Sequence, residues 1–387
     1  MNRRTFIRGM CAGGVATFAA PLTTLASVPS PSKFVFVLLR GGLDGLAAVV
    51  PMGDPHYSQI RQQMGFKKAE ISELEQGFGL APGLAPLRSL WEANEIAAVQ
   101  AMAIPYRTRS HFDGQAVLET GLDRPKGSSD GWLNRLLQVM GGDHSGIAVA
   151  AGLPLSLSGQ HPVMTWSPTR LGAVQDGYLD RLHLLYRSDR QLADRFEAAL
   201  DLGKQVETGM MTLGRARGQA IAPILRATAG FLSKPDGPNI AAVEFSGWDT
   251  HANQGGANGP LDRLLAQLAQ GILSFRSEMG NAWKETTLVV MTEFGRTARP
   301  NGTGGTDHGT AGVGFVIGPK VARSRVVTDW PGLASGDLYE NRDLRPTTDT
   351  RAVIKAALAG SFDLTEAQMN RVFPGSDTVK ATPNLMG

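Results

Sequence analysis

Short apolar runs separated by longer helical stretches constrain this chain more than any other feature of its 387 residues. The first run, residues 33–40 (KFVFVLLR), is continuous, rich in valine and phenylalanine, and ends at two glycines. Similar runs follow at residues 95–104, 239–245, 286–291 and 313–318. Uninterrupted apolar character is typical of strands buried on both faces, and strands that alternate with helices form largely parallel sheets. We therefore expect an α/β fold in which helices cover both faces of a central, largely parallel sheet.

Amphipathic segments predict the helices between these strands. Apolar residues recur at the i, i+3, i+4 spacing that gives a helix one buried face. Helices are predicted at residues 85–94, 130–140, 261–279 and 350–360, and Ser110 is placed to begin another. Residues 176–235 also have a helical pattern, which predicts a helical excursion packed on the sheet.

The first 27 residues have the pattern of an export signal. Arg3 and Arg4 precede an apolar stretch of small residues that contains no acidic residue, and the segment TLAS offers a cleavage site. A membrane anchor needs about 20 apolar residues, and Pro21 interrupts this run. We expect residues 1–27 to be a twin-arginine signal peptide that is removed on export. Residues 28–387 are then expected to form a single domain, periplasmic or secreted, without an integral membrane segment.

Removal of this signal changes the chemistry available to the mature chain. The only cysteine, Cys11, lies within it, so we expect neither a disulfide nor a thiolate ligand in the mature protein. Loss of Arg3, Arg4 and Arg8 leaves 35 of the 38 basic residues, which balance the 35 acidic ones. A chain of balanced charge without basic runs is not expected to bind nucleic acid.

Polar residues gather next to the predicted strands, where parallel sheets bind their ligands. These residues are Asp44 after the first strand, Ser110, His111 and Asp113 after the second, Asp249 and His251 after the third, Glu293 and Arg296 after the fourth, and Asp307 and His308 before the fifth. Carboxylates and imidazoles at one edge suit a divalent ion such as Zn²⁺, Mn²⁺ or Mg²⁺. An ion that bridged a nucleophile and an ester oxygen would activate the one and polarise the other.

Each of these residues also has a purely structural interpretation. Asp44, between glycines, could stabilise a turn, and Ser110 with Asp113 three residues later fits a helix-capping pattern. That second interpretation is compatible with a functional one, because the N-terminus of a helix also offers N–H groups to a phosphate. The remaining polar residues could pair within their loops: Asp249 and His251 as hydrogen-bond partners, Glu293 with Arg296, and Asp307 with His308.

Several longer motifs resemble a bacterial family. The segments RSHFDGQ, GWDTHANQ, TEFGRT and GTDHGT, behind a twin-arginine leader and LLRGGLDGL, are similar to the uncharacterised family called domain of unknown function 1501. The resemblance extends over residues 33–358. The family is grouped with the alkaline phosphatase and sulfatase superfamily, a more distant similarity that implies an alkaline-phosphatase-like three-layer sandwich.

The superfamily resemblance implies roles for particular residues. It implies metal ligands at Asp44, Asp249 and His251, and a nucleophile at Ser110, with Thr108 as the second choice. The spacing of two between Asp249 and His251 is shorter than the spacing of four common among phosphatases, so His251 is the less secure of the pair.

The fourth strand departs from the superfamily pattern. An Asp-His pair normally ends that strand, and here Glu293-Phe294 stands in its place. The resemblance therefore implies a metal ligand at Glu293, where the carboxylate is kept, but not at Phe294. A last histidine normally precedes a strand that closes in Gly-Pro, which implies that His308 is a ligand. Matching Asp307 and His308 to the Asp-His pair instead would leave no later histidine for the last ligand. Phe294 leaves a two-metal site incomplete unless His111 supplies the missing nitrogen, so one ion, two ions or none are all compatible with the sequence.

Two functions follow from the resemblance. The first is an exported metal-dependent hydrolase of phosphate or sulfate esters, in which Ser110 attacks and Arg296 or Arg109 steadies the anionic substrate. The alternative is a non-catalytic exported protein that keeps a degenerate phosphatase-like site and binds a ligand, a glycan or a partner protein. Members of the family are thought to work beside another exported protein, so a companion of that kind is a further expected partner.

Overall fold

The computed structural model describes residues 32–142, 144–167, 185–186, 193 and 221–387. The predicted signal peptide and Cys11 lie outside the described residues, as does most of the predicted helical excursion at residues 176–235. The last part of that excursion forms helix α9, Ile221–Leu232. Within the described residues, no helix combines the length and the hydropathy that a membrane crossing requires.

A nine-stranded sheet forms the centre of the described structure, in the order β11-β5-β10-β9-β1-β8-β6-β7, with β12 beside β5. Its strands are β1 (Lys33–Leu39), β5 (Ile96–Ala103), β6 (Gly146–Val149), β7 (Met164–Trp166), β8 (Ile240–Phe245), β9 (Thr286–Met291), β10 (Gly312–Ile317), β11 (Arg325–Val327) and β12 (Thr348–Asp349). A small second sheet contains β2 (Val49–Val50), β4 (Gly79–Leu80) and β3 (Ser72–Glu73).

Strand direction determines which loops share an edge of the sheet. Strand β1 runs parallel to β8 and β9, whereas β10 runs antiparallel to both of its neighbours, β9 and β5. Strands β5, β8, β9 and β1 therefore end at one edge, and β10 begins at that same edge. Residues that follow the first four strands and residues that precede β10 consequently meet there.

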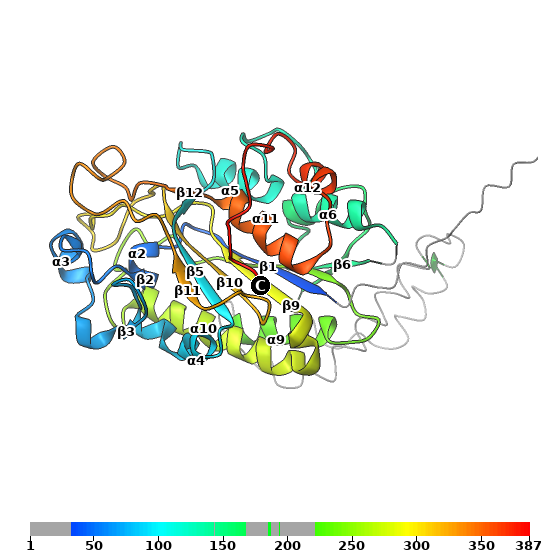
Figure 1. The fold of residues 1–387 in the computed structure, drawn as a ribbon, viewed down its shortest axis with the longest axis horizontal. Coiled ribbons are helices and arrows are strands. Elements are labelled where there is room, and N and C mark those ends of the chain that lie inside the picture. Colours follow the sequence, from blue (N-terminus) through cyan, green and yellow to red (C-terminus); the bar gives the residue numbers. More distant parts are fainter. Residues whose placement is uncertain (1–31, 143, 168–184, 187–192, 194–220) are drawn as a thin grey trace, which may run out of the picture.

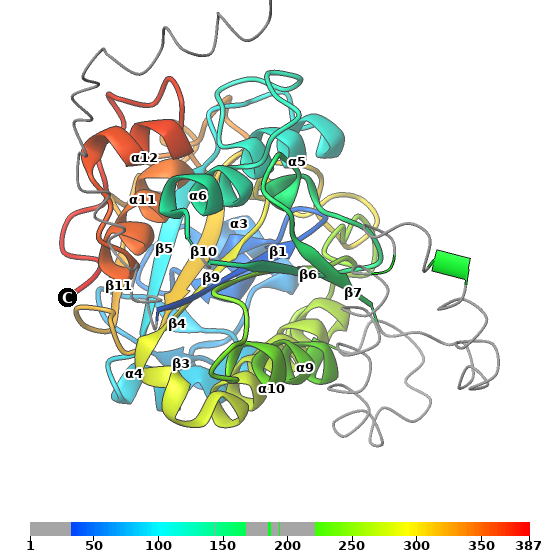
Figure 2. The same ribbon diagram turned by 90° about the vertical axis from the view of Figure 1, so that its right-hand side faces the viewer.

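Helices cover both faces of the sheet, as Figures 1 and 2 show. One face carries α5 (His111–Thr120), α6 (Trp132–Met140), α11 (Thr350–Ser361) and α12 (Glu366–Val372), and the other carries α4 (Arg88–Glu92), α9 and α10 (Pro260–Met279). The short helices α2 (Gly45–Ala48) and α3 (Tyr57–Arg61) follow β1. The predicted three-layer α/β arrangement with a largely parallel sheet is confirmed.

The hydrophobic core is divided between the two faces of the sheet. In β1 the side chains of Val35 and Val37 belong to one buried cluster, while Phe34 and Phe36 belong to the other. Because neighbouring side chains of a strand point to opposite faces, a strand buried on both sides is apolar at every position. This explains the uninterrupted apolar run of residues 34–39.

The five predicted strands and most predicted helices are confirmed within about two residues. The helix predicted at residues 85–94 is shorter: a 3-10 helix covers Pro82–Leu87 and α4 follows it. Pro86 lies inside the 3-10 helix, and proline has no N–H to donate to a regular α-helical ladder.

Candidate metal centre

The candidate site lies at the edge where four strands end and β10 begins. Three segments meet there: the start of α5, the loop after β8 and the glycine-rich loop between β9 and β10. They contribute His111, then Asp249 and His251, then His308. The ligand atoms of His111, Asp249 and His308 all lie within 4.8 Å of one another. This group could hold a metal ion.

Asp249 is the point at which the three histidines converge. Its carboxylate lies 3.4 Å from His111 Nε2 through Oδ2, and 3.1 Å from His251 Nε2 and 3.3 Å from His308 Nε2 through Oδ1. Arg296 also donates to Oδ1. Burial opposes ionisation of Asp249, but the hydrogen bond and charge of Arg296 outweigh it and hold the pKa of this carboxyl below its usual value. Asp249 is therefore an anion at neutral pH.

A buried carboxylate orients His111 from the opposite side of its ring. Nδ1 of His111 lies 2.7 Å from Oε1 of Glu293, whose side chain is fully buried. This hydrogen bond is the main reason that the pKa of His111 is raised. Burial alone would raise the pKa of Glu293, but hydrogen bonds from His111, Gln115 and the N–H of Gly41 outweigh it and lower that pKa. Glu293 remains charged and accepts a hydrogen bond from the Nδ1–H of His111.

The other two histidines are oriented in the same manner. Nδ1 of His308 lies 3.0 Å from the carbonyl oxygen of Arg109. A carbonyl can only accept a hydrogen bond, so Nδ1 of His308 carries its proton. Nδ1 of His251 lies 3.3 Å from Oδ1 of Asp307. Burial, followed by the charge of His111, lowers the pKa of His308 and favours its neutral form.

When Nδ1 carries the proton on both His251 and His308, these contacts place two imidazole lone pairs against one another. When Nδ1 of a neutral imidazole carries the proton, Nε2 has only a lone pair. Nε2 of His251 and Nε2 of His308 are only 2.9 Å apart, and Nε2 of His111 is buried without a hydrogen-bond partner. Lone pairs facing one another beside a carboxylate repel unless a cation lies between them. Outer acceptors that fix each ring are also the usual surroundings of metal-bound histidines.

The spacing of these atoms matches a tetrahedral ion. Ligands at the usual zinc–nitrogen distance of about 2.0–2.1 Å lie roughly 3.3 Å from one another. The separations between Asp249 oxygens and the three Nε2 atoms, and between His251 and His308, run from 2.9 to 3.4 Å. The residues present therefore fit a divalent ion held by His111, Asp249 and His308, with His251 beside them.

Phe294 packs against this cluster instead of supplying a ligand. Its ring centroid lies 4.8 Å from that of His111 and 5.1 Å from that of His308. Gly42 permits this placement, because a side chain there would come within 2.8 Å of the Phe294 ring. Phe294 thus forms an apolar wall that limits the movement of two of the histidines.

Asp44 and Arg296, two of the predicted site residues, are committed to other partners. Oδ2 of Asp44 accepts hydrogen bonds from Arg61 and, at 2.6 Å, from Gln254. The side chain of Arg296 is fully buried and donates to the carbonyl oxygens of Gly41, Gly42 and Thr306 as well as to Asp249. Asp44 thus fixes the loop after β1, and Arg296 fixes Asp249.

Arg109 and Ser110 lie immediately before His111. Arg109 forms ion pairs with Asp343 at 2.8 Å and Glu340 at 2.5 Å. Its guanidinium is therefore directed toward the segment that contains these two carboxylates. Ser110 is the N-cap of α5, and its hydroxyl accepts a long hydrogen bond of 3.5 Å from the N–H of Asp113. The predicted helix start is confirmed, with Ser110 directly beside a cluster histidine.

Gln115 and Asn301 support the site and were not predicted from the sequence. Gln115 donates to Oε1 of Glu293 at 2.9 Å, and Arg40 donates to Gln115 at 2.6 Å. Asn301 donates to Oδ1 of Asp307 at 3.0 Å. The sequence could have predicted the role of Gln115, because residues four apart on a helix share a face and Gln115 is four residues after His111. No sequence pattern predicted the contact of Asn301.

Comparisons with known proteins identify the family of this chain. The sequence profile of the family described as "Protein of unknown function (DUF1501)" matches residues 91–373. No curated protein matches the chain.

The solved structures that match this chain have low identity to it and TM-scores below 0.5. They include Ps i-CgsB in complex with k-i-k-neocarrahexaose (9% identity, 90% of this chain and 77% of that one, TM-score 0.43). The zinc complex of the C-terminal periplasmic domain of EcEptC from Escherichia coli has 12% identity to this chain. The match covers 74% of this chain and 73% of that one, with a TM-score of 0.37. The PsFucS1 sulfatase from Pseudoalteromonas sp. has 12% identity to this chain. The match covers 92% of this chain and 73% of that one, with a TM-score of 0.39. At such values, function has to be argued from this chain's own residues.

Proposed function

This chain belongs to the DUF1501 family of proteins of unknown function, and we propose that it binds one divalent ion and hydrolyses phosphate or sulfate esters. The observation that carries the proposal is the convergence of three imidazole Nε2 atoms on the carboxylate of Asp249. The nitrogen-rich ligand set favours Zn²⁺ over Mn²⁺ and Mg²⁺. A bound ion would polarise the ester and lower the pKa of a coordinated water.

Different residues of the chain would bind the ion and orient its ligands. His111, Asp249 and His308 would hold the ion and leave a fourth position open for water or substrate, with His251 beside them. Glu293, Asp307 and the carbonyl of Arg109 would keep the three rings in the required tautomer. Since the side chain of Arg296 is fully buried against its acceptors, we assign it the task of positioning Asp249.

Ser110 is the proposed nucleophile. Its hydroxyl stands at the N-terminus of a ten-residue helix, where the free N–H groups of the first turn favour an anion such as a phosphate or sulfate. The long capping bond to Asp113 can be given up when the hydroxyl turns toward an ester. As Ser110 attacks, its oxygen bonds to the phosphorus or sulfur atom, its proton passes to water, and the ester's leaving oxygen departs with the electron pair of the broken bond. A second water would then hydrolyse the serine ester and restore the hydroxyl.

A second candidate function rests on the same geometry. The guanidinium groups of Arg109 and Arg296 are both committed to protein acceptors. If neither is released, the site lacks the bidentate clamp that anionic esters usually receive. A metal-dependent binding protein without catalysis, which recognises a ligand, a glycan or a companion protein, is then the alternative.

Hydrolysis assays separate these functions. The protein, loaded with Zn²⁺ or Mn²⁺, would be tested on p-nitrophenyl phosphate, bis-p-nitrophenyl phosphate and p-nitrophenyl sulfate. We expect turnover that disappears in His308→Ala and persists in His56→Ala, a matched histidine change at an exposed helix cap.

Ser110→Asn keeps a good N-cap residue but removes the nucleophile. If Ser110→Asn retains the metal but loses turnover, Ser110 is supported as the nucleophile. If the variant keeps full turnover, a metal-bound water is the nucleophile instead. A metal-loaded protein that turns over none of the three esters favours the binding function.

We also propose export. With residues 1–27 as a twin-arginine leader and residues 28–387 as a single mature domain, the proposed metal centre would lie in the periplasm or outside the cell. Fractionation of the producing cells and mass determination of the mature chain test this. Cleavage near residue 27 is the expected result, and an intact N-terminus in the cytoplasm would contradict it.

A further inference from the structure

Phe112 is an exposed aromatic residue directly beside the candidate metal centre. It follows His111 in the first turn of α5, and 88% of its surface is exposed. Every other phenylalanine in the part of the chain that the structure describes is buried. Because burial of apolar surface is favourable, a phenylalanine left in water at the edge of a site is available to a ligand.

The start of the helix does not explain a phenylalanine at this position. The first turn of a helix favours acidic side chains, because its free N–H groups carry partial positive charge. A hydrophobic contact that fixes the chain at a helix start joins the residue before the N-cap to the fourth helical residue, and these are Arg109 and Gly114 here. Phe112 thus supports neither the core nor the start of α5.

The geometry of α5 places Phe112 at the rim of the site. The preceding residue, His111, points to Asp249 and Glu293. Successive side chains of a helix point about 100° apart, so Phe112 is turned out of this cluster, while its Cα atom lies only about 3.8 Å from that of His111. Ser110, the proposed nucleophile, precedes His111. An ester held at the ion and at Ser110 can therefore extend its organic group toward Phe112.

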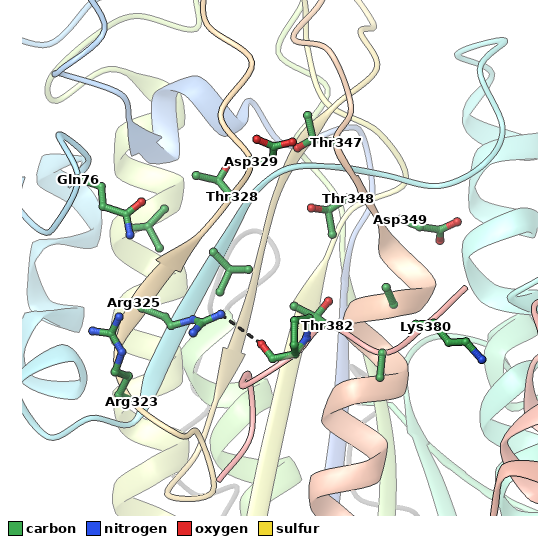
Figure 3. Close-up of a pocket in the computed structure, with 15 residues that line it drawn as sticks. Gln76, Arg323, Arg325, Thr328, Asp329, Thr347, Thr348, Asp349, Lys380 and Thr382 are labelled. Atoms are coloured by element: carbon green, nitrogen blue, oxygen red, sulfur yellow. Dashed lines mark hydrogen bonds between the residues drawn. The ribbon is translucent and has the colours of Figure 1, made fainter. Parts of the chain in front are cut away.

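The groove along the edge strand β11 offers no surface of this kind (Figure 3). It has a volume of about 520 Å³, and no aromatic side chain of the described residues lines it. Arg323 and Lys380 line the groove, but they pair with Glu75 at 3.4 Å and with Glu366 at 4.0 Å. A flat aromatic ligand therefore finds a matching side chain at the rim of the metal centre and not in this groove.

We propose that Phe112 determines specificity by stacking on an aromatic ring of the substrate, so that aryl esters are the preferred class. This rests on the proposed hydrolase function, in which the ion would hold the anionic group of the ester. Paired aromatic rings attract each other beyond the burial of their apolar surface. The polar neighbours of Phe112 already have partners: Asp113 accepts a hydrogen bond from Tyr106 at 2.7 Å, and Gln115 donates to Glu293 at 2.9 Å. The rim is thus better suited to an apolar ring than to the hydroxyl groups of a sugar.

Two phosphonates test this contact in the metal-loaded protein. Phenylphosphonate carries an aromatic ring and methylphosphonate does not, and because a carbon–phosphorus bond replaces the ester bond, binding is measured without hydrolysis. By calorimetric titration, we expect the wild type to bind phenylphosphonate about tenfold more tightly than methylphosphonate. Phe112→Ala should abolish this preference and leave the affinity for methylphosphonate unchanged. Phe112→Tyr, which keeps an aromatic ring, is the matched control and should retain the preference.

The outcomes separate this role of Phe112 from the hydrolase function. Equal binding of the two phosphonates by the wild type, or a preference that survives in Phe112→Ala, would overturn the role of Phe112 and leave the anion site intact. Failure of both phosphonates to bind would contradict the anion site itself, and the ring contact with it. A preference that depends on Phe112, in a protein that hydrolyses no ester, would support the ring contact and contradict catalysis.

Discussion

At the scale of one residue, Glu293 is a buried carboxylate that stays charged and orients a histidine of the candidate site. Its side chain is fully buried, a position in which an unpaired carboxylate would be expensive. Four donors surround it: the N–H of Gly41, the hydroxyl of Thr292, the amide of Gln115 and the ring of His111. The charge is therefore retained, and it holds the ring of His111 with Nε2 facing Asp249.

The first prediction concerns the metal-free protein with Glu293→Gln. Loss of the negative charge should lower the pKa of His111, because the hydrogen bond with Glu293 is the main cause of its raised value. An NMR titration of the histidine ring protons measures this directly. An unchanged pKa for His111 would show that the carboxylate does not control this ring.

The same substitution should have a pH-dependent effect on stability. The raised pKa of His111 contributes stability that is complete below the ordinary histidine value of about 6.5 and fades as pH rises through the raised value. The lowered pKa of Glu293 contributes stability that is complete above about 4.3 and fades as pH falls through the lowered value. The wild type should therefore exceed Glu293→Gln most between about pH 4.5 and 6.5. Urea unfolding at several pH values tests this, and a constant difference would contradict it.

A second prediction at this scale concerns Gln115. Its amide is held between Arg40 and Glu293, so Gln115→Leu should leave the ligands in place but loosen the residue that orients His111. Loss of such outer partners typically weakens metal binding about 10–100-fold. Competition with a chromophoric chelator measures the affinity. Gln270→Leu on α10, whose amide reaches only Ser274 at 3.5 Å, is the matched control, and equal affinities in both variants would contradict the prediction.

At the scale of elements, the glycine-rich loop between β9 and β10 brings ligands from distant parts of the chain together. A Cβ atom at Gly309 would lie 2.3 Å from the carbonyl carbon of Arg296, and one at Gly305 would lie 2.3 Å from that of His251. Backbone packs directly on backbone at both positions. The two glycines thus let the loop fold back so that His308 reaches both Arg109 and Asp249.

A third prediction follows for Gly309→Ala. The clash involves backbone atoms that cannot rotate away, so we expect a loss of about 1–3 kcal/mol in unfolding free energy and a large loss of metal affinity. Gly302→Ala is the control, since a Cβ atom there would meet nothing within 4 Å. Denaturant unfolding and metal titration of both variants provide the comparison. Wild-type behaviour of Gly309→Ala would show that the loop does not depend on this close approach.

At the scale of the whole molecule, the sheet accounts for most of what the sequence predicts. The apolar runs that form β1, β5, β8, β9 and β10 were recognisable because a strand buried on both faces has no polar position. The positions of His111, Asp249, His251 and His308 beside those strands follow from the same pattern. The sequence could not show that Arg61 would pair with Asp44, or that Arg296 would pair with Asp249, because those contacts depend on how separate loops pack.

A fourth prediction belongs to the complete fold. The proposed ligands come from α5, from the loop after β8 and from the loop before β10, so a bound ion would link three distant segments. Zn²⁺ at 100 times its dissociation constant should add about 2.7 kcal/mol of stability, seen as a rise in melting temperature. His308→Ala should show no such rise, and an equal rise in that variant would indicate binding elsewhere.

The metal content of the folded protein tests the central claim most directly. Wild-type protein and the variants His111→Ala, His308→Ala and His56→Ala would be incubated with Zn²⁺ or Mn²⁺, freed of excess ion and analysed by mass spectrometry. The proposed site predicts about one ion per chain in the wild type and in His56→Ala, and little or none in the other two variants. A folded wild type that retains neither ion, or equal content in all four proteins, would contradict it.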